Sequence, residues 1–409
     1  MAIEVTLEGR FEEENDFEGY MNFIQETAIK NQLKMEIYED CAVIDVCPEG
    51  YIEISCENLY VSISAQTNVA GAGFHAFVCD FFAQIQKRSP IVLNANDPTG
   101  YYDQRNFNHL KYGIFHRWLA DIVKYVKEEE DTVSELCISW PLDYYQPKHK
   151  QGYIVTPLGY INKQDFCHTD INELAERFFI WNQLGRTADY YRNAALNLLW
   201  KECYFEFSNM NEETKKQADT ILDLLEIAYE KNPELPLPLT EYHLLCEIRK
   251  REKKQIDAQA MTNPVKIGYR YDNVEYHYGN WCITLEGFCE KNFDHINQLC
   301  YLMSPYRSEE EPWKWMIRME AVNNLIDLNQ QENDWKVIGK SMSWKQGDAF
   351  GIGVHISNED HVLIEAYLAH HDEQLFVQAV VCDESDVEYL LKQIQSISYQ
   401  NKEMPSLQA

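Results

Sequence analysis

The chain has 409 residues, of which 45% are apolar and 13% aromatic, so it can fill a sizeable core and general disorder is excluded. Its length exceeds what one ordinary core supports, which predicts two or three domains. The formal net charge of −30 disfavours a general nucleic-acid binder, because such a surface repels the phosphate backbone.

The sequence also indicates a compartment. No stretch approaches the roughly 20 apolar residues that span a bilayer, and residues 1–16 have neither the basic nor the apolar region of a signal peptide. None of the 12 cysteines forms a C-x-x-C pair, and most lie among apolar neighbours. We therefore expect a soluble, cytoplasmic protein with free, structural thiols.

The first third of the chain alternates between strand and helix patterns. Period-two alternation predicts a strand over residues 2–9, and a helix carries apolar residues at helical spacing from Phe17 to Ala28. Four short strands joined as antiparallel hairpins follow: "LKMEIY", "AVIDVC", "YIEISC" and "LYVSISAQT". After a second helix come a strand at 91–97 and an amphipathic helix from about 107 to 126. These elements predict an N-terminal α+β domain over residues 1–130.

The rest of the chain divides in two. Residues 131–262 contain mostly helical patterns, which predicts a helical middle segment. Strand patterns return in residues 263–409, which predicts a C-terminal α+β domain. There we expect a hairpin that turns at Asp272–Asn273, then a strand at 281–287. Helices around 292–303 and 312–328, four strands and a final helix complete the predicted order.

The two ends of the chain show the same order of elements. Each has a strand, a helix, four strands and a helix, and each contains "TLEG", at Thr6–Gly9 and Thr284–Gly287. We predict two antiparallel-sheet α+β domains that flank the helical middle. A duplicated β-α-β-β-β-β-α unit is one interpretation, although four shared residues do not establish it.

The segment "TNVAGAGFHAFVCDFF" (67–82) contains a candidate phosphate-binding turn. Gly71-x-Gly73-x-x-Ala76 matches the relaxed dinucleotide-binding fingerprint. Asp97 follows about 20 residues later, at a strand end, where such folds place the acid that binds a ribose hydroxyl. The candidate cofactor-binding residues are therefore Gly71, Gly73 and Asp97.

Three features favour a structural turn instead. The strand that leads into Gly71 alternates, whereas a first Rossmann strand is buried on both faces and continuously apolar. That strand ends several residues before Gly71, and it is the last strand of an antiparallel meander. The following helix carries an unbroken apolar stripe of the kind that packs on a sheet. The nucleotide interpretation requires "LYVSISAQT" and "IVLNAND" to be adjacent parallel strands with a right-handed crossover.

Other candidate residues are scattered. His75 and Cys79, at i and i+4, could be half of a metal site or a nucleophile pair, but no second ligand pair stands out, so a packed pair is favoured. His370–Glu373 is interpreted as a polar hairpin turn. The aromatic-rich segment 139–153 is interpreted as a recognition loop or an interdomain linker, and 250–255 as a solvated basic helix face that forms ion pairs. We predict no catalytic residues, metal or cofactor.

The expected function follows from charge and from the missing motifs. The common Walker, nucleophile-elbow and zinc-protease patterns are absent from the sequence, which favours a non-catalytic protein. We expect an acidic protein-interaction module, such as an immunity or adaptor protein that binds a basic partner, with no direct nucleic-acid or membrane binding. The alternatives are a nucleotide-binding enzyme or sensor that uses Gly71–Ala76, and an inhibitor that mimics nucleic acid.

Overall fold

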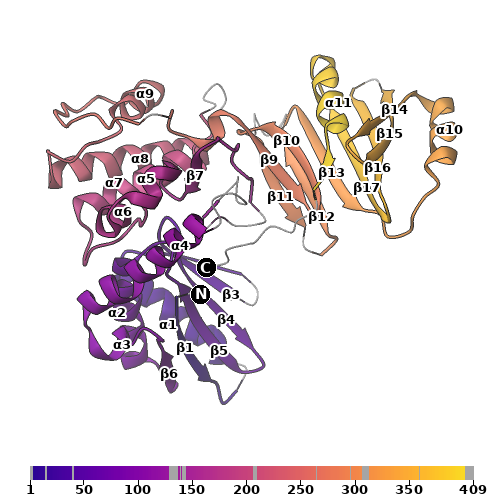
Figure 1. The fold of residues 1–409 in the computed structure, drawn as a ribbon. Coiled ribbons are helices and arrows are strands. Elements are labelled where there is room, and N and C mark those ends of the chain that lie inside the picture. Colours follow the sequence, from indigo (N-terminus) through magenta and orange to yellow (C-terminus); the bar gives the residue numbers. More distant parts are fainter. Residues whose placement is uncertain are drawn as a thin grey trace.

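Among the residues that it describes, a computed structural model shows an α+β protein with four antiparallel sheets. The structure describes residues 3–13, 16–38, 41–128, 137–138, 140, 144–205, 210–263, 265–294, 296–305, 313–358 and 360–400. Figure 1 shows the first sheet and its helices at the lower left, the helical middle above them, and the remaining strands on the right. Two antiparallel-sheet regions thus flank a mainly helical middle, as predicted.

The N-terminal region is a six-stranded sheet with order β2-β3-β4-β5-β1-β6. Every pair in it is antiparallel. The alternation predicted from the sequence is confirmed here. Its elements are β1 (Glu4–Arg10), α1 (Asp16–Lys30), β2 (Lys34–Ile37), β3 (Cys41–Cys47), β4 (Gly50–Glu57), β5 (Tyr60–Gln66), α2 (Ala72–Arg88) and β6 (Leu93–Asn96).

This sheet has one covered and one open face. Val5 and Leu7 of β1 point into the core beneath α1 and α2 and are fully buried. The opposite face carries polar side chains, and Glu8, Asp45 and Glu53 on it are exposed. Such alternation is typical of an antiparallel sheet with one solvated face.

Between β6 and η3 (Tyr269–Tyr271), the described residues are mainly helical and include one small hairpin, β7–β8. The long helix predicted from about 107 to 126 is confirmed as a π-helical turn that runs into an α-helix. A second turn of π-helix extends the helix that begins at Ala188. The elements are α3 (Tyr101–Gln104), η1 (His109–Phe115), α4 (His116–Glu128), β7 (Tyr153–Thr156), β8 (Gly159–Asn162), α5 (Lys163–His168), α6 (Ile171–Glu176), α7 (Ala188–Asn197), η2 (Leu198–Glu202), α8 (Glu212–Lys231) and α9 (Leu239–Arg249).

The C-terminal region contains a three-stranded and a seven-stranded sheet, with orders β18-β10-β9 and β11-β12-β13-β17-β16-β15-β14. Its final helix is α11 (Val387–Gln395). The other elements are η3 (Tyr269–Tyr271), β9 (Asn273–Tyr278), β10 (Trp281–Glu286), β11 (Glu290–Asp294), β12 (Leu299–Met303), β13 (Trp315–Ala321), α10 (Leu328–Ile338), β14 (Lys340–Gln346), β15 (Ala349–Ser357), β16 (Val362–His370), β17 (Glu373–Val381), η4 (Glu384–Asp386) and β18 (Ser398–Tyr399).

Several predicted elements in this region are wrong. The segments 292–303 and 312–328 were expected to be helices, but they contain β11, β12 and β13. The hairpin expected at Asp272–Asn273 turns instead at Gly279–Asn280, between β9 and β10. Helix α10 was not predicted. Alternating burial along β12 and β13 shows the physical reason, because each strand packs one face against the core.

The two end regions share a connectivity. In the first, β1 is followed by α1, four meander strands and α2, and β1 pairs with β5. In the second, β13 is followed by α10, four meander strands and α11, and β13 pairs with β17. The β-α-β-β-β-β-α order therefore occurs twice, but the second copy begins at β13 rather than at 281–287. The "TLEG" of residues 284–287 belongs to a different sheet and is not a matching position.

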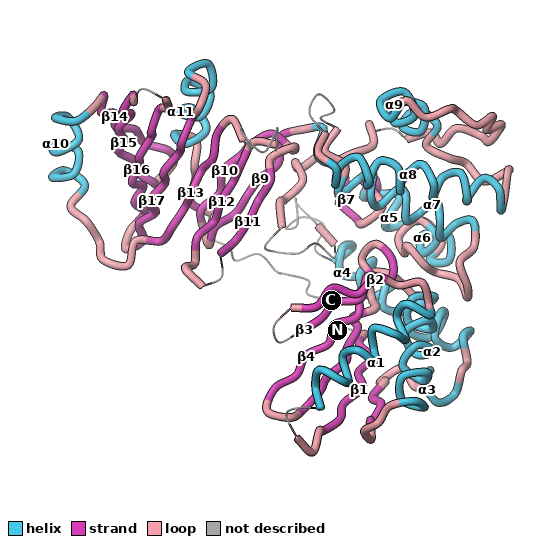
Figure 2. The backbone as a smooth tube through the Cα atoms, turned by 180° about the vertical axis from the view of Figure 1, so that it is seen from behind, coloured by secondary structure: helices cyan, strands magenta, loops and turns pink. Residues whose placement is uncertain are grey.

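The two copies pack their first helices differently. Trp335 of α10 packs on Ile352 and Val354 of β15. Leu390 of α11 instead belongs to the large core with Ala366, whose side chain points to the other face of the sheet. Helices α10 and α11 thus cover opposite faces, as Figures 1 and 2 show, whereas α1 and α2 share one core.

Two large buried clusters cross the predicted domain boundaries. One cluster includes the N-terminal sheet and extends to Ala194 in α7. The other begins at Tyr145 and extends to Ile397. Because each cluster spans one of the predicted boundaries, the clusters do not mark where one domain ends, and the boundaries at 130 and 262 stay predictions. Helix α7 contributes side chains to both clusters.

The structure also bears on the cysteine prediction. All twelve cysteines lie among the described residues, none forms a disulfide, and seven are buried. Burial of most thiols is therefore confirmed.

Within the described part of the chain, no helix has the length and apolar character needed to cross a membrane.

His116 gives a prediction about pH dependence. It is buried at the start of α4, and its Nδ1 lies 3.1 Å from Asn172 Oδ1 at the start of α6. Burial lowers the pKa of His116 below its usual value of 6.5, and the Lys111 ammonium lowers it further. The folded protein therefore binds this proton less tightly than the unfolded chain does. Neutral His116 therefore makes its full contribution to the free energy of unfolding above the usual pKa of 6.5, and this contribution is lost as the pH falls below that value.

The test is urea unfolding of the wild type and His116→Gln between about pH 7.5 and pH 5.5. We expect the wild type to lose more free energy of unfolding over this range than the variant does. Equal losses in the two proteins would contradict the assignment.

Candidate functional site

The start of α2 is packed against another segment of the chain. The Gly73 amide donates to Trp181 O at 2.8 Å, and the Trp181 amide donates to Ala70 O at 2.8 Å. A Cβ atom on Gly73 would lie 2.2 Å from Gln183 O and 2.2 Å from Trp181 Cδ1. Gly71 has a φ of +110°, which favours glycine. Both glycines therefore allow residues 179–183 to approach the helix, and the Gly73 amide that would bind a pyrophosphate is already bonded to Trp181 O.

The strand order also differs from the one that a dinucleotide fold requires. Strand β5, which leads into Gly71, lies between β4 and β1 and is antiparallel to both. Strand β6 pairs with the other edge of β1, so β5 and β6 are not adjacent. This arrangement supports the structural turn, which the sequence already favoured.

Asp97 lies beside His75 rather than at an open ligand site. Its Oδ1 is 3.4 Å from His75 Nε2, and it accepts hydrogen bonds from Thr99 and from the Tyr102 amide. Burial raises the pKa of Asp97, but hydrogen bonds and the charge interaction with His75, together with the other donors, hold it well below its usual range. Cys79 lies close enough for the ligand atoms of His75, Cys79 and Asp97 to fall within 4.8 Å of one another.

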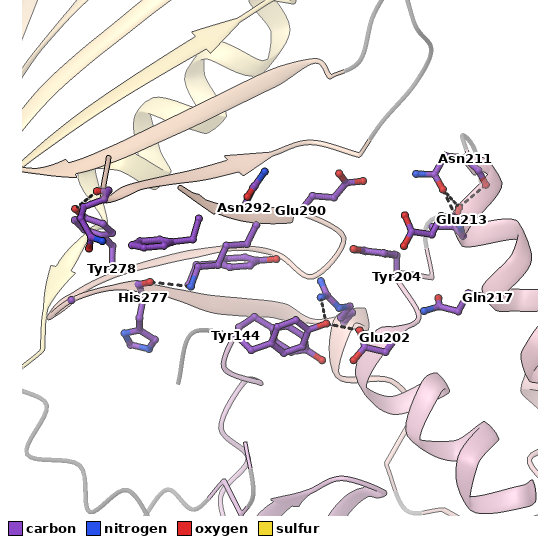
Figure 3. Close-up of a pocket in the computed structure, with 18 of the residues that line it drawn as sticks. Tyr144, Glu202, Tyr204, Asn211, Glu213, Gln217, His277, Tyr278, Glu290 and Asn292 are labelled. Atoms are coloured by element: carbon purple, nitrogen blue, oxygen red, sulfur yellow. Dashed lines mark hydrogen bonds between the residues drawn. The ribbon is translucent and has the colours of Figure 1, made fainter. Parts of the chain in front are cut away.

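A cleft lies between the helical middle and the C-terminal strands. Its volume is about 1100 Å³. Figure 3 shows Glu213 and Gln217 on α8 on one side and Glu290 and Asn292 on β11 on the other. Because the walls come from segments far apart in sequence, the fold alone assembles this site.

The lining of the cleft is rich in aromatic residues and carries charges of both signs, because Arg270 and Lys291 lie in it beside the carboxylates. Three carboxylates, those of Glu202, Glu213 and Glu290, face it. Amide side chains add further hydrogen-bonding groups. The aromatic and amide residues of the lining are Tyr144, Tyr145, Tyr204, Tyr276, Tyr278, Phe293, Asn211, Gln217, Asn280, Asn292 and Gln298.

One wall of the cleft is built around the buried guanidinium of Arg270. This group donates to Gly287 O at 2.7 Å, to Lys201 O at 3.1 Å and to Tyr144 Oη at 2.9 Å. Its carbon lies 4.2 Å from the centre of the Tyr145 ring. Arg270 thereby joins the end of η2 to the turn after β10 and fixes the position of Tyr144.

The tyrosines of this wall are neutral at physiological pH. Burial raises the pKa of Tyr144 and of Tyr204, and the Arg270 charge offsets only part of the rise. Tyr144 Oη donates to Glu202 Oε2, so its hydroxyl orients that carboxylate. The cleft thus offers neutral aromatic faces beside ionisable carboxylates.

A search against protein-family models finds no match for the chain, and no curated protein sequence matches it.

Two residues of a segment singled out in the sequence line the cleft. The segment 139–153 was interpreted as a recognition loop or an interdomain linker, and Tyr144 and Tyr145 within it belong to the lining. Residues 139 and 141–143 lie outside the described residues. Glu202, Glu213 and Glu290 were missed, because no spacing in the sequence shows that three distant carboxylates converge.

Two further predictions concern polar surface segments. His370–Glu373 forms the turn between β16 and β17, as expected. The basic run 250–255 was expected on a helix, but α9 ends at Arg249. Its ion pairs are confirmed, since Arg251 and Lys254 both contact Glu226 of α8.

Proposed function

We propose that this protein is a non-catalytic interaction module that holds a basic segment of a partner protein in the cleft. The observation that carries the proposal is the convergence of Glu202, Glu213 and Glu290 with tyrosine rings around one cavity. Guanidinium and ammonium groups bind to carboxylates by charge-assisted hydrogen bonds and to aromatic faces by cation–π attraction.

The wall of the cleft already contains an arrangement of this kind. Arg270 lies 4.2 Å from the Tyr145 ring centre and 4.5 Å from that of Tyr204. Tyr145 is buried, so an incoming arginine would meet the Tyr204 ring, together with the carboxylates. Tyr204 is half-buried and contributes to both the wall and the opening.

The size of the cleft supports a peptide segment rather than a single side chain. A volume of about 1100 Å³ lies slightly above the usual range for pockets that bind drug-sized ligands. The net charge of −30 attracts a basic partner before contact and thereby raises the association rate constant. Binding is therefore expected to weaken as salt is added.

An immunity or adaptor protein that sequesters a basic toxin or enzyme is one member of this class. The open face of the N-terminal sheet does not favour the alternative of a nucleic-acid mimic. Glu4 and Glu8 on β1 are four residues apart, which corresponds to roughly 14 Å, with Thr6 between them. Phosphates on one DNA strand follow one another at about 3.4 Å along the axis, so this spacing does not imitate them.

The test uses a peptide of alternating arginine and glycine, with a citrulline–glycine peptide as the uncharged probe. Isothermal titration at low salt is expected to show binding of the arginine peptide alone. Replacing Glu213 by Gln removes one cleft carboxylate and is expected to weaken binding about three- to tenfold. Tyr204→Ala removes a ring face and is expected to weaken binding to a similar extent.

Glu212→Gln is the matched control. Glu212 precedes Glu213 in the first turn of α8, its side chain is 92% exposed, and it pairs with Lys215 rather than lining the cleft. Both variants lose one charge from the same helical turn, but only Glu213 lines the cleft. A difference in binding between them therefore reports on the cleft. Equal weakening in the two variants, or no binding of the arginine peptide to the wild type, would count against the proposal.

A further inference from the structure

A second cluster of chemically reactive side chains lies in the N-terminal region, away from the cleft-lining residues. His75 and Cys79 occupy successive turns of α2, and Asp97 directly follows β6. Their side chains are buried, with exposed fractions of 0% for His75 and 1% for Asp97. One nitrogen, one sulfur and one carboxylate oxygen of the three residues lie within 4.8 Å of one another.

The His75 ring is held by a partner on its far side. Nδ1 lies 2.9 Å from Thr67 Oγ1, which in turn lies 3.0 Å from Ile3 O. When the Thr67 hydroxyl donates to this carbonyl, its oxygen accepts the proton of Nδ1. The other nitrogen, Nε2, then presents its lone pair to Asp97. A ligating histidine is oriented in this way in most metal sites.

Asp97 is held in place just as firmly. The Thr99 amide donates to Asp97 Oδ1 at 2.9 Å, and the Tyr102 amide donates to Oδ2 at 2.8 Å. The Thr99 hydroxyl lies 2.8 Å from Oδ1 and 3.2 Å from His75 Nε2, and its only proton goes to the carboxylate. The lone pair of Nε2 then faces Asp97 Oδ1 and Thr99 Oγ1 with no proton between them. A cation bound to Nε2 and Oδ1 stabilises this arrangement.

We propose that His75 Nε2, Cys79 Sγ and the Asp97 carboxylate bind one divalent transition-metal ion of the Zn²⁺ type. A mixed nitrogen, sulfur and oxygen set suits Zn²⁺, whereas the thiolate disfavours Mg²⁺ and Ca²⁺. Three protein ligands leave one position of a tetrahedral shell for water or a substrate atom.

The charges of the site balance when the ion is bound. The Asp97 carboxylate and a Cys79 thiolate neutralise a divalent cation, so the buried cluster carries no net charge. Burial raises the pKa of Cys79, so without metal this residue is a thiol. Metal binding breaks the S–H bond, forms a metal–sulfur bond and releases one proton to solvent.

A second group in the described structure has the same ligand types. Glu275, His277 and Cys282 also have ligand atoms within 4.8 Å of one another. The Glu275 side chain is, however, 44% exposed, and its oxygen lies 3.8 Å from His277 Nε2. This less enclosed group serves as the matched control for the proposed site.

The experiment titrates the chelator-treated full chain with Zn²⁺ and with Co²⁺. We expect one ion per chain, about one proton released per Zn²⁺, and a thiolate-to-cobalt charge-transfer absorption with Co²⁺. Cys79→Ser should abolish this absorption, whereas Cys282→Ser should retain it. Asp97→Asn should weaken Co²⁺ binding at least about tenfold, because loss of even an outer-sphere partner costs that much.

Circular dichroism checks that each variant is folded. If Cys79→Ser does not fold, the sulfur absorption of the wild type and the weaker Co²⁺ binding of Asp97→Asn decide the question. Absence of Co²⁺ uptake by the wild type, or uptake without the sulfur absorption, would overturn the proposal. Loss of the absorption in Cys282→Ser with retention in Cys79→Ser would also overturn it and assign the ion to the second group.

Discussion

Replacing Arg270 by Met is expected to lower the free energy of unfolding by about 2–4 kcal/mol. The Arg270 side chain is buried, and its guanidinium is the group that bridges Lys201 O and Gly287 O. Lys201 O keeps a second donor, the Tyr145 hydroxyl at 2.7 Å. Gly287 O loses its 2.7 Å bond, and a buried carbonyl without a donor accounts for most of the expected loss.

A matched substitution at a more exposed arginine isolates this effect. Arg249 makes two hydrogen bonds to Asp219, whose side chain is 42% exposed. Arg249→Met should therefore cost no more than about 1 kcal/mol. Arg270→Lys should recover only part of the loss, because an ammonium group lacks the planar fork that serves both carbonyls. Urea unfolding measures all three variants, and equal losses for the two methionine variants would contradict the bridging role.

The sequence was most informative where one face of a sheet is solvated. In β1 and β3–β5, buried and exposed residues alternate, so period two is visible without any knowledge of partners. The turns between these strands are short, which also predicts the antiparallel order. Both signals are local, and a local signal can be recognised in a single sequence.

The prediction failed where tertiary packing determines the secondary structure. Strand β12, "LCYLM", is only five residues long, and so short an apolar run does not distinguish a strand from a helix. The pairing of β12 with β11 and β13 on either side determines the outcome. The "TLEG" similarity misplaced the second copy of the unit for a related reason, since four residues carry no information about sheet order.

The candidate sites likewise depend on contacts between segments that lie far apart in the sequence. His75 and Cys79 were singled out as an i, i+4 pair, and Asp97 was singled out separately as a candidate ribose-binding acid. Nothing local shows that Asp97 contacts the start of α2. Tyr144 and Tyr145 were recognisable as part of an aromatic loop. The carboxylates that complete the cleft come from η2, α8 and β11, and only the fold brings them together.

Replacing Gly73 by Val is expected to lower the free energy of unfolding by more than about 3 kcal/mol. The first added carbon would lie 2.2 Å from Gln183 O and 2.2 Å from Trp181 Cδ1. Trp181 cannot easily retreat, since its amide bonds Ala70 O and its indole donates to Gly185 O at 2.9 Å. The variant must therefore separate residues 179–183 from α2, which exposes core surface that the wild type buries.

Gly19 provides the control, because it lies exposed within α1 and a Cβ there meets nothing within 4 Å. Gly19→Ala should raise the free energy of unfolding by up to about 1 kcal/mol through helix propensity alone. The nucleotide interpretation predicts the opposite for Gly73→Val: near-normal stability, with loss of a ligand-induced thermal shift that the wild type shows. A nucleotide at 100 times its dissociation constant adds about 2.7 kcal/mol, so thermal denaturation with and without nucleotides separates the two explanations. A destabilised Gly73→Val protein, together with a wild type that no nucleotide stabilises, would establish that the glycine pair serves close packing between α2 and residues 179–183.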